Sequence, residues 1–199
     1  MLTAGHCGIN GSSWNDASSH FYGTMSRNLT SYNYQASFDY AVINKPAGDI
    51  LDLGFNFSGT TASTNSRYQS GGYITPYLGL TLCSSGSFSG ENCNLTVNSL
   101  NQSVIYVNES GIEATYDALT GVHSNGTYAV WGRGDSGGPV YVANGTGGAT
   151  IAGLISGGYG TSKPCKERDT VERACRSDGY FASFSYLKSK WNVNLNLDY

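Results

Sequence analysis

The sequence predicts a fold built almost entirely of β-strands, with a single helix near the C-terminus. Charged residues make up 13% of the 199 residues, about half the usual share, while 27 glycines and 15 tyrosines are present. Glycine favours turns, whereas tyrosine and threonine favour strands. Short apolar segments with a period of two alternate with turn-rich stretches along most of the chain. Together these observations indicate an all-β protein.

Several segments have the alternation and the β-branched content that strands require. They are residues 38–43, 78–83, 94–100, 103–108, 138–143 and 150–156. A helical period occurs only near the end, where the apolar face consists of Phe181, Phe184, Leu187 and Trp191, with the stem of Lys188 lying along it. Residues 192–197 alternate again and are expected to form a last strand.

The charge balance limits the partners that the chain can have. A net charge of −3 without a basic cluster argues against nucleic acid and against an anionic membrane surface. The longest apolar runs are far too short to cross a bilayer. We therefore expect no nucleic-acid partner and no membrane association. The length allows one domain with a substantial core or two small packed domains.

The five cysteines predict two local disulfides. Cys83 and Cys93 enclose a loop of the same length as Cys165 and Cys175, and this spacing leaves Cys7 alone. The alternative is five buried thiols in a cytosolic protein. No CxxC motif occurs, so a zinc site is not expected.

The stretch "GRGDSGGPV" (132–140) places Ser136 in a glycine-rich turn that fits the pattern G-x-S-x-G. An α/β-hydrolase needs its histidine after the serine, but His6, His20 and His123 all precede Ser136. A subtilisin-like order needs an acid before the histidine, and no acidic residue precedes His6. The order that remains is His, Asp, Ser.

His6 and Asp39 are the candidate base and acid. His6 follows an apolar start and enters a turn, whereas His20 and His123 lie in polar stretches and are expected to be solvated. Asp39 stands at the head of an apolar strand, where a lone carboxylate is costly to bury unless an imidazole and hydrogen bonds satisfy it. The other aspartates considered have turn-like surroundings and are expected at the surface: Asp16, Asp49, Asp52 and Asp117.

The motifs "TAGHC", "DYAVI" and "GDSGGPV", in this order, resemble the three signatures of chymotrypsin-like serine peptidases. The secreted bacterial branch of streptogrisin and α-lytic protease is the most similar, through "GRGDSGG", "CSSGSFSGENC", "GLISGG" and the closing "YFASFSYLKSKW". The resemblance covers nearly the whole chain. It implies two packed antiparallel β-barrels and a C-terminal helix. Residues 1–62 would carry His6 and Asp39, residues 63–199 would carry Ser136, and the apolar-poor segment 59–72 would link the halves.

The resemblance also implies a role for each motif residue. Ser136 would attack the scissile carbonyl, His6 would move its proton, and Asp39 would hold the imidazole. The backbone N–H groups of Gly134 and Ser136 would stabilise the oxyanion. The resemblance implies that the protein is a secreted monomer that cleaves proteins or peptides. This chemistry would need neither a metal nor an organic cofactor.

Substrate binding is implied for residues on two segments. The backbone of Ser156, Gly157 and Gly158 would offer a strand edge to an extended substrate. Val130 and Ile155 would wall the primary pocket. Because neither segment supplies an acid, we expect an apolar or small neutral side chain at P1, the substrate residue on the N-terminal side of the scissile bond.

The sequence departs from the family pattern beside Ser136. In bacterial members an arginine often follows the first cysteine of the local pair and neutralises the aspartate before the catalytic serine. Here Ser84 stands at that place, so Asp135 needs another partner, for which Arg133 and Arg67 are the candidates.

The second departure is at the N-terminus. The strands that usually precede "TAGHC" would complete the first barrel and carry the partner of Cys7, yet Met1 stands immediately before this motif. We therefore expect an incomplete first barrel in a truncated chain that is less stable than an extended version.

The sequence favours a serine endopeptidase over two alternatives. One is a catalytically inactive homologue that binds proteins on the same scaffold, although such relatives usually lose one of the three residues that this chain keeps. The other is a truncated product that does not fold.

Overall fold

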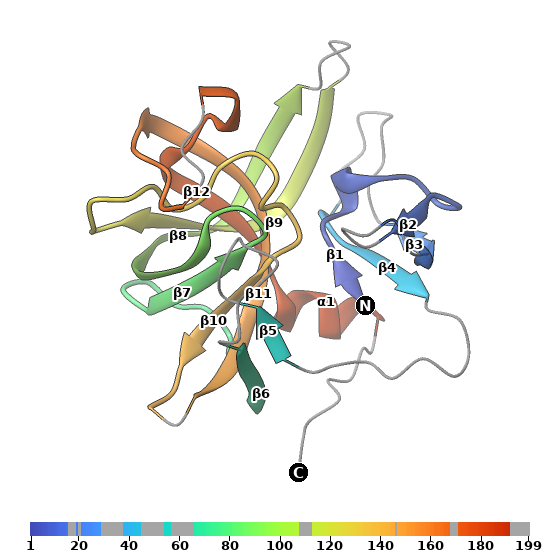
Figure 1. Ribbon diagram of the computed structural model, residues 1–199, viewed down its shortest axis with the longest axis horizontal. Coiled ribbons are helices and arrows are strands. Elements are labelled where there is room, and N and C mark those ends of the chain that lie inside the picture. The colour runs from blue at the N-terminus through green and yellow to red at the C-terminus, as the bar shows by residue number, and fades with distance from the viewer. Residues whose placement is uncertain are drawn as a thin grey trace.

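The computed structural model describes residues 1–15, 19, 21–28, 38–44, 54–56, 66–107, 113–145, 147–167 and 171–191. Strands dominate, and one α-helix follows the last of them (Figure 1). The first elements in chain order are β1 (Leu2–Thr3), the 3₁₀ helix η1 (Gly5–Cys7), β2 (Ser13–Asn15), β3 (Phe21–Asn28), β4 (Ala41–Asn44), β5 (Gly54–Asn56) and β6 (Ser66–Tyr73). They are followed by β7 (Thr81–Gly86), β8 (Gly90–Val107), β9 (Glu113–Ser124), β10 (Pro139–Ala143), β11 (Gly148–Ser162), the 3₁₀ helix η2 (Val171–Arg173), β12 (Arg176–Ser183) and α1 (Phe184–Trp191).

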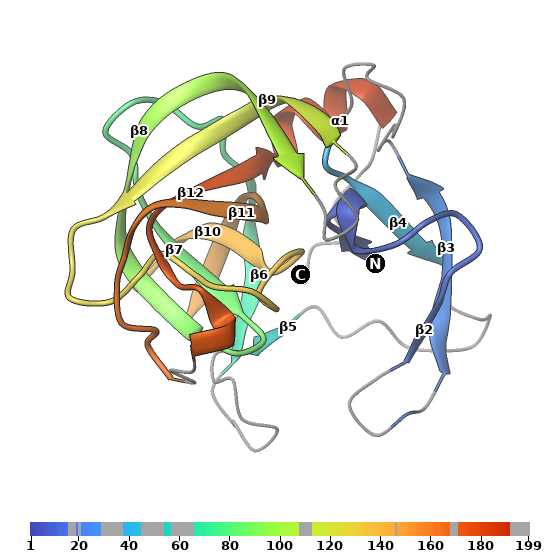
Figure 2. The ribbon, with the colours of Figure 1, turned by 90° about the horizontal axis from the view of Figure 1, so that it is seen from above.

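The strands form two sheets. The first has the order β1-β4-β3-β2, and the second has the order β10-β7-β8-β9-β12-β11-β6-β5. In the second sheet β10 also pairs with β11, so the strands between them close into a barrel, which Figure 2 shows curling around its interior. Among the described strands only β6 and β11 pair in parallel. The predicted all-β fold with a C-terminal helix is confirmed.

Each predicted strand segment that lies within the described residues overlaps an observed strand, but two of them belong to one element. Residues 94–100 and 103–108 were expected to be separate, whereas β8 runs through both up to Val107. The pairing of β8 with β9 shifts register three times between Val97 and Val104, and Asn101 has a φ of 54°. These irregularities bend one long strand. In the sequence, the same residues look like a turn between two separate strands.

The predictions near the C-terminus and in the linker need correction. Phe181 lies in β12, which pairs with β11 on one side and β9 on the other, so the helix begins only at Phe184. Residues 66–72 of the predicted linker belong to β6, which pairs with β5 and β11. The predicted boundary between residues 62 and 63 and the predicted strand 192–197 lie outside the described residues.

The interior contains two main apolar clusters. One fills the barrel and consists of Leu80, Leu82, Leu95, Val97, Val122, Val130, Trp131, Val140, Ala152, Ile155 and Phe181. The other joins the two halves of the chain. It contains Tyr40 together with Leu154 and with Leu187 of α1, and the Tyr40 hydroxyl donates a hydrogen bond to the Ser183 carbonyl. The ring of Phe38 lies 4.7 Å from that of Tyr186. These contacts fix the segment that carries Asp39 against the barrel.

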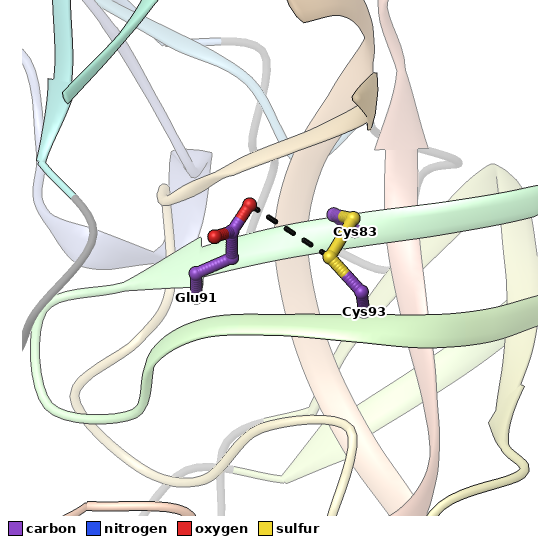
Figure 3. Close-up of side chains that lie close together, drawn as sticks. All are labelled: Cys83, Glu91 and Cys93. Carbon is purple, nitrogen blue, oxygen red and sulfur yellow. Dashed lines mark hydrogen bonds between the residues drawn. A yellow bond between two sulfur atoms is a disulfide. The ribbon is translucent and has the colours of Figure 1, made fainter. Parts of the chain in front are cut away.

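Both predicted disulfides are present, Cys83–Cys93 and Cys165–Cys175, and Cys7 is a free cysteine. The first bridge links β7 to β8, with the Glu91 carboxylate 3.7 Å from the Cys93 sulfur (Figure 3). Cys83, Glu91 and Cys93 are close enough to hold a metal ion, but the sulfurs are bonded to each other, so this cluster offers no thiolate. No helix in the described part of the chain is long and apolar enough to cross a membrane.

Candidate active site

The pairing of β1 with β4 brings His6 to Asp39. In this antiparallel pair Leu2 lies opposite Val42, and Thr3 lies opposite Ala41. If this register is continued beyond the two strands, η1, which contains His6, lies beside the segment just before β4, which contains Asp39. The short first strand therefore sets the position of the imidazole.

Asp39 holds His6 through three contacts. His6 Nδ1 lies 2.8 Å from Asp39 Oδ2 and 3.0 Å from Oδ1, and the backbone N–H of His6 donates to Oδ1 over 2.9 Å. The Asp39 side chain is fully buried, whereas 31% of the His6 side chain is exposed. An ionised Asp39 can only accept, so it assigns the proton to Nδ1 and leaves Nε2 as an acceptor.

The contact between His6 and Asp39 shifts the pKa of both side chains. Burial alone would lower the pKa of His6, but the charge and hydrogen bonds of the Asp39 carboxylate outweigh it and raise the pKa above 6.5. Burial alone would likewise raise the pKa of Asp39, but the His6 cation and the hydrogen bond from Ser156 lower it below 3.8. Asp39 therefore favours the imidazolium form of His6.

Ser156 supplies a further contact that the sequence did not reveal. Its buried hydroxyl donates to Asp39 Oδ2, and the Tyr106 hydroxyl lies 3.3 Å from Ser156 Oγ. The sequence suggested only a backbone role for Ser156, because a serine before two glycines resembles any strand edge. The side chain instead helps to satisfy the carboxylate that orients His6.

Ser136 and His6 line one pocket of about 520 Å³. The Ser136 hydroxyl donates to the Ser156 carbonyl over 3.2 Å, and in the described part of the chain it makes no hydrogen bond with His6. The structure thus brings the three sequence-predicted residues to one site, with Ser136 turned toward Ser156.

The backbone around Ser136 leaves two N–H groups unused. From residue 132 to 138 the amides of the other residues donate to Asp135, Arg173, Gly132 or Ile155. Only the N–H groups of Gly134 and Ser136 have no partner among the described residues. A glycine conformation makes this turn possible, because Gly134 has a φ of 89°.

Asp135, beside Ser136, is buried and forms an ion pair with Arg173. Its Oδ2 lies 2.5 Å from Arg173 Nη2, and the two side chains are 0% and 8% exposed. The carboxylate also accepts hydrogen bonds from the Phe88 amide at 2.9 Å, the Ser89 amide at 3.1 Å, the Ser89 hydroxyl at 2.6 Å and the Gly132 amide at 3.0 Å. The charge is therefore compensated and every lone-pair direction is used.

The expectation that Arg133 or Arg67 neutralises Asp135 is wrong. Arg133 is exposed, and Arg67 pairs with Glu91 over 2.9 Å. Arg173 reaches the site because the loop closed by Cys165–Cys175 packs on the serine loop, where Arg133 N–H donates to the Arg173 carbonyl over 2.6 Å. In the sequence, the only sign of this partner for Asp135 is an arginine two residues before Cys175.

Comparison of the sequence with protein-family models and with curated proteins finds no match. Solved structures do match along almost the whole chain. The Nocardiopsis protease NAPase has a TM-score of 0.68 at 24% identity, covering 98% of this chain and 84% of that one. Thermobifida fusca protease A has a TM-score of 0.66 at 24% identity, covering 99% and 84%. Cellulomonas bogoriensis chymotrypsin has a TM-score of 0.65 at 24% identity, covering 99% and 85%. The chain has the chymotrypsin-like serine protease fold.

On this chymotrypsin-like fold, the residues expected to bind substrate lie in two environments. Ser156, Gly157 and Gly158 line the pocket with His6 and Ser136. By contrast, Val130 and Ile155 are almost completely buried in the barrel core. Ile155 and Ser156 are neighbours and face opposite sides of β11. Between Ile155 and Gly157 the pairing of β11 with β12 shifts register, so the pocket side of the strand continues along Gly157 and Gly158.

Trp131, next to Val130, forms a wall of this pocket. Its indole N–H donates to the Gly157 carbonyl over 2.9 Å, and the side chain is almost completely buried. The ring fills the space beside Gly179, where any Cβ would overlap it.

His123 also differs from the sequence prediction. It lies in β9 rather than in a polar loop, and its Nδ1 lies 2.8 Å from Asp178 Oδ1. Asp117 lies in the same strand and accepts a hydrogen bond from the Ser103 hydroxyl. The remaining acids and the third histidine lie outside the described residues: Asp16, Asp49, Asp52 and His20.

Replacing Gly137 with alanine is expected to destabilise the fold by at least about 1–2 kcal/mol, because Gly137 has a φ of 83°. A Cβ there would also overlap the Thr3 hydroxyl, where β1 meets the serine loop. Chemical denaturation should show the loss, with Gly126→Ala as the control, since a Cβ on Gly126 meets nothing within 4 Å. Equal midpoints for the two variants would contradict this close approach.

Proposed function

We propose that the protein is a serine endopeptidase that hydrolyses peptide bonds through an acyl-enzyme. The observation that carries the proposal is the single pocket lined by both Ser136 and His6, whose imidazole is held by a buried Asp39. Proteases of the same fold among the structural neighbours support a peptide substrate. The two disulfides support a location outside the reducing cytosol. A monomer suffices for this site, since His6, Asp39 and Ser136 come from one chain.

In the first step Ser136 turns from the Ser156 carbonyl toward His6 Nε2. Nε2 takes the hydroxyl proton as Oγ attacks the carbonyl carbon of the scissile bond. The positive charge that forms on His6 is stabilised by Asp39, which stays ionised. This assignment agrees with the proton on Nδ1 that the contacts with Asp39 require.

The negative charge that develops on the substrate oxygen needs donors. The N–H groups of Gly134 and Ser136, which have no partner among the described residues, are the proposed donors. One such donor typically contributes about 3–4 kcal/mol of transition-state stabilisation. The tetrahedral intermediate then collapses, His6 protonates the leaving amine, and water hydrolyses the ester on Ser136 by the same steps in reverse.

The substrate backbone is proposed to extend β11 along Ser156–Gly158. A peptide added to this edge would exchange main-chain hydrogen bonds with the strand, and glycine allows close approach. These contacts are sequence-independent, so they position the scissile bond without selecting its side chains.

Hydrolysis of fluorescently labelled casein tests the proposed activity. The protein should release soluble fluorescent peptides, and the Ser136→Ala variant should release none above background. Peptide mass spectrometry of the digest would identify new termini. Equal release by Ser136→Ala would assign the activity to another group and overturn the proposal.

A further inference from the structure

Two arginines, Arg133 and Arg176, line the pocket that contains Ser136, and none of its lining residues is acidic. Two buried carboxylates near Ser136 are each paired with a basic side chain. Asp39 is paired with His6, and Asp135 is paired with Arg173. The described lining of the pocket therefore contains two arginines and no acidic residue, although the chain has a net charge of −3.

We propose that Arg133 and Arg176 select a substrate that carries an acidic side chain close to the scissile bond, at P1 or P3. This inference rests on the proposed peptidase function and specifies its substrate class. It differs from the apolar or small neutral P1 preference expected from the sequence, because two arginines line the pocket whereas Val130 and Ile155 lie in the core.

Arg176 lies beside the edge where the substrate would bind. Its backbone pairs with Trp131, because Arg176 N–H donates to the Trp131 carbonyl over 3.2 Å. Its Cβ and Cγ lie 3.2 Å from the position that a Cβ on Gly158 would take. The guanidinium is at the surface, where Nη1 donates to the Ser162 hydroxyl over 3.3 Å. A hydroxyl does not neutralise the cation, so a carboxylate would be a stronger partner.

Arg133 approaches from the serine loop. It is the residue before Gly134, whose N–H is a proposed oxyanion donor, and it is exposed. Arg133 and Arg176 therefore come from two segments that both border the pocket. Guanidinium groups present paired N–H donors that match a carboxylate, and a neutral amide of the same shape lacks the charge.

Strand geometry restricts which substrate side chains can reach them. If P1 lies next to Ser156, P3 lies two residues further from the scissile bond, next to Gly158. The side chains of P1 and P3 point to the same face, whereas P2 points to the other. The carboxylate must therefore come from P1 or P3.

Matched peptides that differ only in charge test the proposal. One pair carries Glu or Gln at P1, another carries Glu or Gln at P3, and all other positions are alanine before a fluorogenic leaving group. We expect kcat/KM to favour Glu about tenfold in one pair, and the ratio to fall as salt is added. In the double variant Arg133→Gln/Arg176→Gln the ratio should fall to about one. Lys190→Gln, which removes a cation from an exposed position of α1, should keep the wild-type ratio.

Binding to the Ser136→Ala variant provides a readout that does not depend on catalysis. Fluorescence anisotropy should show about tenfold tighter binding of the Glu peptide than of the Gln peptide in the favoured pair. Cleavage of all four peptides without a preference for Glu would overturn the charge selection and leave the peptidase function intact. No cleavage together with selective binding of Glu would support the charge selection and contradict the peptidase function. Equal binding in both pairs would overturn the inference.

Discussion

Replacing Asp39 with asparagine is expected to lower kcat/KM about 10⁴-fold at neutral pH, the size of the effect that this change has in a chymotrypsin-like triad. The Asp39 carboxylate accepts from His6 Nδ1 and thereby leaves Nε2 free to take a proton from Ser136. An asparagine amide can donate to Nδ1 instead, which moves the proton to Nε2. The imidazole would keep its place but lose its function as a base.

The pH dependence of the same variant has a defined sign. In the proposed mechanism the neutral imidazole is the active form. Because Asp39 raises the pKa of His6 above 6.5, wild-type kcat/KM should rise with pH with a midpoint above 6.5. Without the carboxylate charge, the pKa of His6 falls and the midpoint should move to lower pH. Asp117→Asn, in β9, is the matched control and should leave both rate and midpoint unchanged. An Asp39→Asn enzyme within tenfold of wild type would show that Asp39 does not fix the tautomer.

Replacing Arg173 with methionine is expected to cost about 3–5 kcal/mol of unfolding free energy. The change leaves the Asp135 charge in a buried site with only neutral donors. Activity should fall together with stability, because Asp135 holds the turn that presents the N–H groups of Gly134 and Ser136. Denaturant unfolding and casein hydrolysis measure the two effects.

Two further variants separate the charge from the packing of this arginine. Arg173→Met combined with Asp135→Asn removes both charges and should recover part of the lost stability. Arg67→Met removes a partly exposed partner of Glu91 and should cost only about 0–1 kcal/mol. A loss below about 1 kcal/mol for Arg173→Met would contradict the role of a buried counter-ion.

The sequence was most informative where local pattern and chain order carry the signal. The equal spacing of the cysteines predicted both disulfides, and alternation located the strands around 81–86, 139–143 and 148–162. The order of His6, Asp39 and Ser136 selected two residues that line one pocket, His6 and Ser136, and the buried carboxylate that holds His6. These features depend on a few neighbouring residues or on simple order.

The sequence was least informative where a contact depends on which segments cross. Arg173 reaches Asp135 only because a disulfide-closed loop folds over the serine loop. Phe181 fits a helical period by coincidence, and its place in a central strand follows from pairing with β9 and β11. Trp131 and Arg176 face the pocket through an irregular bridge between distant segments, which no local pattern records.

Reaction with a fluorophosphonate probe, followed by peptide mass spectrometry, tests the central claim most directly, since only an activated serine reacts. The account predicts one adduct per chain, located on Ser136 and absent from His6→Ala. The adduct should form faster as pH rises, because neutral His6 is the proposed base. A wild-type chain without an adduct, or one in which Ser136 reacts equally well in His6→Ala, would contradict it.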